Sequence, residues 1–316
     1  MDPMHSDSRV VAPSVGLHSI AGLDHRYIES IISRARLFRA DPRPEPSLRG
    51  VEIAMLFFES STRTRVSFEV AATRLGARAF NFDAKASSLS KGETLKDTVE
   101  TIASFGCDAM VVRSPSAGAT KLIATWAMCP VINAGDGAHQ HPTQALIDMF
   151  TIAEYHQSQG DFSSLRVGIV GDILNSRVAR SLIDAFGILG SEVVLIAPKT
   201  LMPNFGPRAQ VSYAHDFDEH LPELDIVYLL RVQRERIDQG LIPSFGEYVS
   251  RYALSRERYA RLKAGALVMH PGPVFPGMEV DAAVADGSSS LIRRQTENSV
   301  FVRMAVLESI FGKEGN

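Results

Sequence analysis

Short apolar runs alternate with amphipathic segments of helical length through the first half of the chain. The apolar runs predict strands, and the segments with apolar side chains three or four positions apart predict helices. We expect strands at residues 51–58, 79–82, 109–112 and 131–134, and helices at residues 62–76, 93–105, 117–127 and 141–156. This alternation is typical of a parallel sheet covered by helices.

The alternation resumes after residues 157–164, a polar stretch that contains Gly160. Here we expect strands at residues 166–170, 192–197, 210–214, 225–230 and 266–269, and helices at residues 176–189, 256–262 and 297–311. The predicted fold class is therefore α/β, with two doubly wound domains whose sheets are mainly parallel. We divide the chain into a flexible tail at 1–15, a first domain at 16–143, a second domain at 144–296, and a C-terminal helix at 297–316 that packs back on the first domain.

Composition narrows the class of protein without naming a function. Apolar residues make up 45% of the 316 residues and charged residues 22%, which is ordinary for a globular enzyme. A net charge of −3 without a basic block does not suggest nucleic-acid binding, and no apolar run approaches the ~18 residues that span a membrane. The two cysteines, Cys107 and Cys129, each open an apolar run and form neither a disulfide framework nor a metal site. We therefore expect a cytoplasmic protein.

The first polar motif follows the buried strand at 51–58 and enters a helix. Ser61 or Thr62 could simply cap that helix. Capping does not explain Arg63 and Arg65, because cations in a first turn oppose the helix dipole at a cost of ~0.3–1 kcal/mol each. An anion bound at the helix N-terminus would reverse that sign, so we favour a phosphate site here.

Five more polar motifs each follow a predicted strand, which is where ligands sit in doubly wound folds. They contain Arg113, the run His141-Pro142-Thr143-Gln144, Arg177, Arg231 with Gln233, and the run His270-Pro271-Gly272-Pro273. A histidine at a helix N-terminus is favoured as a neutral donor, and arginine suits bidentate binding of carboxylates. A solvated loop would explain each motif singly but not the set.

Together these motifs resemble the aspartate and ornithine carbamoyltransferase family over roughly residues 50–310. Ser61-Thr62-Arg63-Thr64-Arg65 is similar to the family signature that holds carbamoyl phosphate. The resemblance implies a catalytic set of Arg63, Thr64, Arg113 and His141. It also implies that carbamoyl phosphate is bound by Ser61, Thr62, Arg63, Thr64, Arg113, His141, Gln144, Pro271 and Gly272. The first domain would then bind carbamoyl phosphate and the second aspartate.

The acceptor and the partners also follow from the resemblance. Thr143 matches the aspartate branch, since the ornithine branch typically has cysteine there. Lys91, Arg177, Arg231 and Gln233 are then expected to bind L-aspartate. Residues 87–95 resemble a mobile loop that reaches the neighbouring subunit's site, which implies a homotrimer that shares Ser87 and Lys91. Regulatory or dihydroorotase subunits are possible partners.

The implied reaction belongs to pyrimidine biosynthesis and gives N-carbamoyl-L-aspartate and phosphate. We expect direct attack by the amine without a covalent enzyme intermediate, a cofactor or a metal. The alternatives are an ornithine-type carbamoyltransferase and a non-catalytic scaffold homologue. A dehydrogenase is less favoured because Gly168 and Gly171 do not complete a dinucleotide fingerprint. Residues 274–277 depart from the Asn-Arg-Gly that many family members carry, and Arg303 is expected to be structural.

Overall fold

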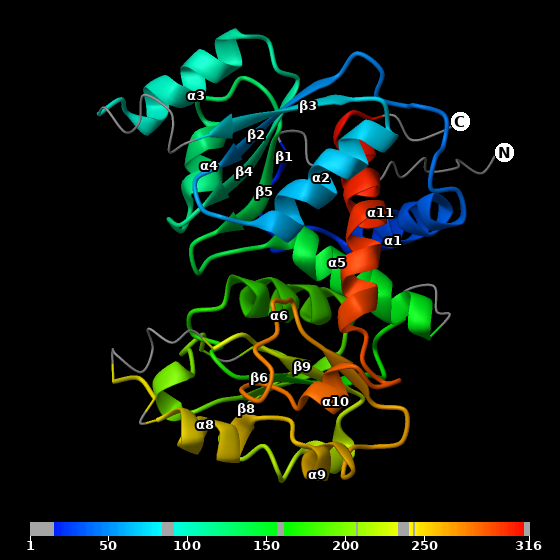
Figure 1. Cartoon of the computed structure of the whole chain (residues 1–316), viewed down its shortest axis with the longest axis vertical. Coiled ribbons are helices and arrows are strands. Elements are labelled where there is room, and N and C mark those ends of the chain that lie inside the picture. The colour runs from blue at the N-terminus through cyan, green and yellow to red at the C-terminus, as the bar shows by residue number, and fades with distance from the viewer. Residues whose placement is uncertain are drawn as a thin grey trace, which may run out of the picture.

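The computed structural model describes residues 16–83, 92–156, 161–206, 208–232, 240–242 and 244–312. Its first lobe is built on a five-stranded sheet in which every neighbouring pair is parallel (Figure 1). The strand order is β1-β5-β4-β2-β3. The strands are β1 (Gly16–Leu17), β2 (Glu52–Phe57), β3 (Arg78–Asp83), β4 (Ala109–Ser114) and β5 (Val131–Asp136).

The second lobe repeats this plan with its own five-stranded parallel sheet. Its strand order is β10-β9-β6-β7-β8. The strands are β6 (Arg166–Val170), β7 (Glu192–Ile196), β8 (Val211–Ala214), β9 (Ile226–Leu229) and β10 (Leu267–Met269). Two doubly wound sheets confirm the predicted fold class.

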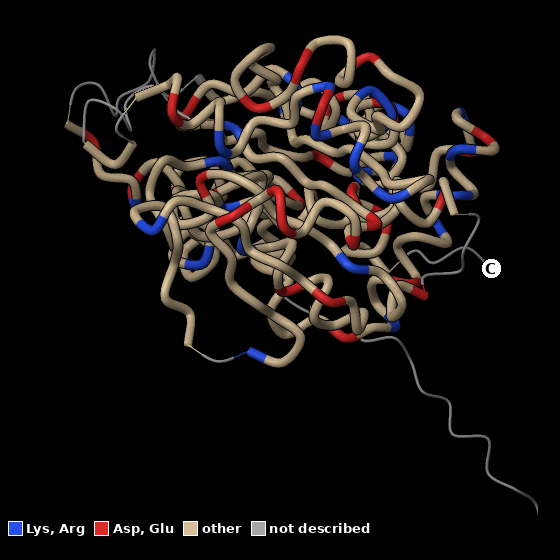
Figure 2. The backbone as a smooth tube through the Cα atoms, turned by 90° about the horizontal axis from the view of Figure 1, so that it is seen from below, with Lys and Arg blue, Asp and Glu red and all other residues tan. Residues whose placement is uncertain are grey.

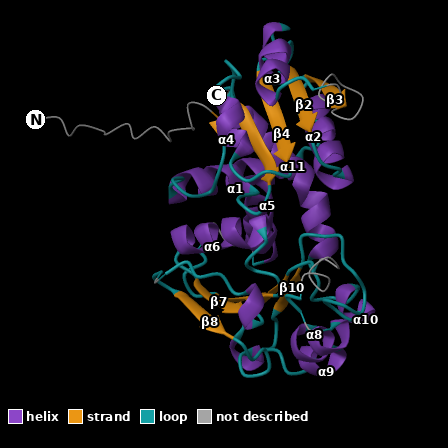
Figure 3. Ribbon diagram, turned by 90° about the vertical axis from the view of Figure 1, so that its left-hand side faces the viewer, coloured by secondary structure: helices purple, strands orange, loops and turns teal. Residues whose placement is uncertain are grey.

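Helices cover the two sheets and join them. The first lobe holds α1 (His25–Ala40), α2 (Thr62–Arg74), α3 (Leu95–Ser104), α4 (Ala119–Ala124) and α5 (Pro142–Tyr155). The second holds α6 (Arg177–Leu189), α8 (Phe245–Tyr252), α9 (Arg256–Tyr259) and α10 (Ala282–Ala285). Helices α5 and α6 pack on each other where the lobes meet (Figure 3).

The last helix, α11 (Ile292–Ile310), leaves the second lobe and packs against α1, α2 and α5 (Figure 1). The predicted return of the C-terminal helix to the first domain is confirmed. The helix begins at Ile292, five residues before the predicted start at residue 297. The predicted domain boundary at residues 143 and 144 stays a prediction.

The strand orders fix where a ligand can bind. In the first sheet β2 lies between β3 and β4, and in the second β6 lies between β7 and β9. The connections reverse direction at β2/β4 and at β6/β9, and the carboxyl ends of strands at such a switch point form a crevice. The segments after β2 and β6 carry Arg63 and Arg177, and β4 carries Arg113 near its end.

Charge is spread over the molecule. Figure 2 shows lysine and arginine interspersed with aspartate and glutamate along the described backbone. In the part of the chain that the structure describes, none of the helices has the length and apolar character that crossing a membrane requires.

Candidate active site

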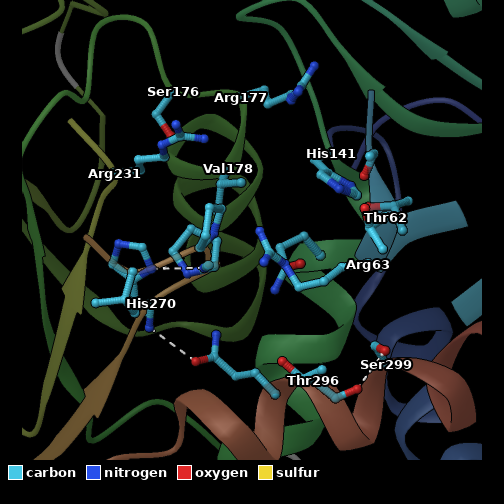
Figure 4. Close-up of a pocket in the computed structure, with 18 of the residues that line it drawn as sticks. Thr62, Arg63, His141, Ser176, Arg177, Val178, Arg231, His270, Thr296 and Ser299 are labelled. Carbon is cyan, nitrogen blue, oxygen red and sulfur yellow. Dashed lines mark hydrogen bonds between the residues drawn. The ribbon is translucent and has the colours of Figure 1, made fainter. Parts of the chain in front are cut away.

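A cavity of about 540 Å³ opens between the lobes. Figure 4 shows Thr62, Arg63 and His141 on one side of it, and Ser176, Arg231 and His270 on the other. Eleven of the residues predicted from the sequence line this cavity. They are Ser61, Thr62, Arg63, Thr64, Arg113, His141, Gln144, Arg177, Arg231, Pro271 and Gly272. The predicted residues Ser87, Lys91 and Gln233 lie outside the described residues.

The N-terminus of α2 presents free backbone donors to the cavity. Ser61 is the N-cap residue with extended backbone, but its side chain makes no capping hydrogen bond within the described structure. The capping alternative considered for this motif therefore does not account for Ser61. The first amides of a helix have no intrahelical partner, so those of Thr62 and Arg63 can bind an anion. Thr64, one turn into the helix, is buried.

One carboxylate bridges two arginines from different lobes. Glu59, which follows β2, lies with its Oε1 2.7 Å from Nε of Arg113 and forms an ion pair with Arg177. Arg113 also donates from Nη1 to the backbone oxygen of Ala134, 3.1 Å away. The two guanidinium groups are thus held close together in the wall of the cavity by one acid.

Both histidines of the cavity are held neutral. His141, the N-cap residue of α5, is buried, and burial followed by Arg113 and Arg177 holds its pKa well below the usual range. Its Nδ1 has no partner among the described residues. Burial, then Arg63 and Arg231, lower the pKa of His270 to about 3. A neutral imidazole can donate a hydrogen bond to a carbonyl oxygen without adding charge.

The remaining arginines make the cavity strongly cationic. Burial lowers the pKa of Arg113 to about 10, with Arg177 the next cause, and burial and Arg231 lower that of Arg63. Burial and Arg113 lower the pKa of Arg303 to about 9. Cations that depress one another's pKa indicate a site built for anions, since a bound anion would relieve both burial and repulsion.

The turn after β10 closes the far side of the cavity. Gly272 has a φ of +64°, and a Cβ there would lie 3.2 Å from Cζ of Arg63. Only glycine fits this approach without displacing the guanidinium. The amide of Gly272 donates to Nδ1 of His270 over 2.8 Å, which fixes the turn (Figure 4).

Helix α11 supplies a side of the cavity that the sequence motifs do not predict. Gln295, Ser299 and Arg303 recur every four residues and line the cavity with Thr296. A polar stripe on an otherwise buried helix was the available signal. Glu59 had no comparable signal, because it is one acidic residue in a polar loop. Among the described residues no group of three His, Cys, Asp or Glu side chains could hold a metal ion.

Comparisons with known proteins agree with this geometry. Residues 16–154 match the carbamoyl-phosphate-binding domain of aspartate/ornithine carbamoyltransferases, and residues 163–310 match their Asp/Orn-binding domain. The chain is 48% identical over 281 residues to the aspartate carbamoyltransferase catalytic subunit of Parafrankia sp., covering 89% of this chain and 90% of that one. It is 45% identical to the subunit from Frankia casuarinae, covering 99% of both chains.

Solved structures give the same result. Aspartate transcarbamoylase from Trypanosoma cruzi, crystallised with carbamoyl aspartate and phosphate, superposes with a TM-score of 0.84 at 30% identity, over 95% of this chain and 96% of that one. The catalytic subunit of M. jannaschii aspartate transcarbamoylase gives 0.79 at 31% identity, over 95% and 98%. Both halves of the fold and the motifs of the cavity therefore place this chain in the aspartate/ornithine carbamoyltransferase family.

Proposed function

We propose that this protein is an aspartate carbamoyltransferase. It transfers the carbamoyl group of carbamoyl phosphate to the amine of L-aspartate and releases N-carbamoyl-L-aspartate and phosphate. One observation carries the proposal. A phosphate-type site at the α2 N-terminus and a second set of arginines, Arg177 and Arg231, line the same cavity from opposite lobes.

Carbamoyl phosphate binds on the side of the first lobe. The α2 amides, Ser61, Thr62 and Arg63 hold its phosphate, because a helix N-terminus and a guanidinium both favour the dianion. The carbonyl oxygen lies toward Arg113, His141 and Thr64. Gln144 and the turn at Pro271 and Gly272 receive the carbamoyl nitrogen.

Aspartate binds on the side of the second lobe. The planar guanidinium groups of Arg177 and Arg231 can bind its two carboxylates. Arg177 begins α6, and Arg231 lies just after β9. Ornithine carries a second amine, which an arginine pair repels. Glu59 now pairs with Arg177, so this acid has to give up that contact when the substrate carboxylate arrives.

The reaction then proceeds by direct attack. The amine nitrogen bonds to the carbamoyl carbon, and the carbonyl becomes an oxyanion that Arg113, neutral His141 and Thr64 stabilise as preorganised donors. The C–O bond to phosphate breaks, and the leaving phosphate takes the proton from the amine. Holding two anions in line contributes much of the rate, with ~7–11 kcal/mol available from proximity.

The proposed assembly is a homotrimer in which Ser87 and Lys91 complete a neighbour's site. The loop that contains them joins β3 to α3 and lies outside the described residues. The family resemblance supports the assignment. Regulatory or dihydroorotase subunits stay a prediction.

A steady-state assay with carbamoyl phosphate and either L-aspartate or L-ornithine tests the function. We expect turnover with aspartate alone. Arg231→Ala should lower kcat/KM for aspartate by roughly 10- to 100-fold, the cost of one charged hydrogen-bonded contact. Arg251→Ala is the control, because Arg251 is an exposed residue of α8 whose ion pair in the described part of the chain is with Glu247 of the same helix.

Three outcomes would contradict the proposal. Turnover with ornithine would move the chain to the other branch of the family. An Arg231→Ala variant whose KM and kcat match those of the wild type would show that the aspartate carboxylate is bound elsewhere. Inactivity of the folded protein with both acceptors would favour a scaffold role.

A further inference from the structure

A fully buried carboxylate lies behind the cavity. Asp148 of α5 is completely inaccessible to solvent. Its Oδ1 accepts hydrogen bonds from Nε2 of Gln144 at 2.9 Å and from Nε2 of Gln295 at 2.7 Å. Its Oδ2 accepts one from the hydroxyl of Tyr228 at 2.7 Å. The acid thus joins α5, α11 and β9, yet it does not line the cavity itself.

These contacts fix which way the side-chain amide of Gln144 faces. A carboxylate oxygen only accepts, so Gln144 must turn its NH2 group toward Asp148. A flipped amide would bring two acceptors together at 2.9 Å. The other amide atom, Oε1 of Gln144, has no donor among the described residues. Gln144 lines the cavity, so that oxygen is available to a ligand.

Protonation of Asp148 does not change this orientation. Burial raises the pKa of Asp148 to about 7 against the hydrogen bonds from Gln295, Tyr228 and Gln144, which lower it. A proton on the acid would sit on Oδ2 and face the oxygen of Tyr228. Oδ1 would remain the acceptor for both glutamines.

A second branch of the same network reaches the turn after β10. Gln295 also turns its NH2 group toward Asp148, and its Oε1 accepts from the backbone amide of His270 at 3.1 Å. His270 in turn accepts from Gly272. The turn and Gln144 therefore take their positions from one buried acid.

We propose that Asp148 is a positioning residue that makes the cavity selective for an acyl phosphate bearing an NH2 group. It does so by holding Gln144 with its carbonyl oxygen free to accept a hydrogen bond from that group. The inference rests on the proposed function, because it assumes that the transferred group is carbamoyl. Acetyl phosphate has the same shape but carries a methyl group in place of NH2, so it cannot make this hydrogen bond.

The test compares the affinities of carbamoyl phosphate and acetyl phosphate by calorimetry, without aspartate. The variants are Asp148→Leu and Asp148→Asn, whose side chains have the same heavy-atom count and branching as aspartate. Leucine cannot accept a hydrogen bond, so the carbamoyl-to-acetyl affinity ratio should fall about tenfold, the worth of one oriented hydrogen bond. Asparagine keeps one acceptor oxygen and should retain the wild-type ratio.

Tyr228→Phe is the matched control. It removes one hydrogen bond from the same acid but leaves both glutamine contacts, so the ratio should stay within about twofold of the wild type. If Asp148→Leu does not fold, Asp148→Ala is used instead and should lower the carbamoyl-to-acetyl affinity ratio in the same way. Equal weakening of both ligands in the Leu or Ala variant, with the ratio unchanged, would overturn the proposal and leave Asp148 a purely structural residue.

Failure of this inference is distinguishable from failure of the proposed function. If wild-type protein binds both acyl phosphates equally, the selectivity proposal fails even when turnover with aspartate is observed. If the ratio behaves as expected but aspartate is not carbamoylated, the selectivity proposal stands and the acceptor assignment fails.

Discussion

Replacing Arg303 by methionine tests whether this buried cation stabilises the fold or helps to bind an anion. Arg303 is 2% exposed, and among the described residues no carboxylate pairs with it. It donates to the hydroxyl of Ser67 and lies over the ring of Phe68, 4.8 Å from the centroid. From the sequence alone we expect a structural role for Arg303. Its place in the cavity wall suggests instead that it helps to hold the anion.

The magnitude follows from the pKa of Arg303, which burial and then Arg113 lower from 12.5 to about 9. At about 1.4 kcal/mol per pKa unit, the charged form costs roughly 5 kcal/mol in the folded state at neutral pH. The pKa of Arg303 is lower in the folded protein than in the unfolded chain. The cost of the charge is therefore fully present below pH 9, and it is relieved as the pH rises from about 9 toward 12.5. The contact with the Phe68 ring offsets ~1–2 kcal/mol of this cost, and the hydrogen bond to Ser67 offsets ~1.5–3 kcal/mol.

We therefore expect the ligand-free Arg303→Met variant to be about 1 kcal/mol more stable than the wild type, rather than less. Urea denaturation in phosphate-free buffer, at equal protein concentration, measures this. The phosphate concentration that stabilises the protein should rise about tenfold or more in the variant, and less in Arg303→Lys, which keeps the charge. A variant that loses over ~2 kcal/mol and binds phosphate unchanged would refute the reasoning and make Arg303 structural.

Two further predictions concern the turn after β10. Gly272→Ala should lower kcat/KM for carbamoyl phosphate by roughly 10- to 100-fold, because its Cβ would displace Arg63. Gly277→Ala is the control, because Gly277 has a φ of +81° but open space where a Cβ would lie. This variant should have similar backbone strain and an unchanged kcat/KM. Equal kcat/KM values for the two variants would disprove the steric argument. The pKa of His270 is about 3 in the folded protein and 6.5 in its usual state. Between pH 6.5 and pH 3 the unfolded chain therefore binds more protons than the folded protein, and the free energy of unfolding falls as the pH drops through this window. His270→Asn should flatten this fall by up to ~1.4 kcal/mol per pH unit in urea denaturation at pH 7, 6 and 5, and an unchanged slope would contradict the assignment.

Sequence patterns located most of the fold because buried parallel strands are continuous apolar runs. The strand predicted at residues 166–170 matches β6, and the helix predicted at residues 141–156 contains α5. Helix α1 was missed, although Ile28, Ile31, Ile32 and Phe38 have helical spacing and Asp24 caps it. Its apolar residues alternate with charged ones, so no apolar run marks it. Helix α8 was missed because it has only eight residues.

Some residues of the site could be predicted from the sequence, and others could not. Residues that follow strands, such as Arg63 and Arg231, could be predicted because the ends of parallel strands converge at one edge. The contact between Asp148 and Gln295 could not, since 147 positions separate the two residues in the sequence. Only the packing of α11 on α5 brings them together.

The path of α11 also bears on how the chain is made. Synthesis proceeds from the N-terminus, and domains generally fold as they emerge from the ribosome. Here the groove formed by α1, α2 and α5 stays open until residues 292–310 have been translated, because α11 fills it. Until then, water reaches the side chains that pack against Val302, Val306 and Leu307 in the finished protein, where these three residues are fully buried. The first lobe thus precedes the second in the sequence but cannot be completed until α11 has been synthesised.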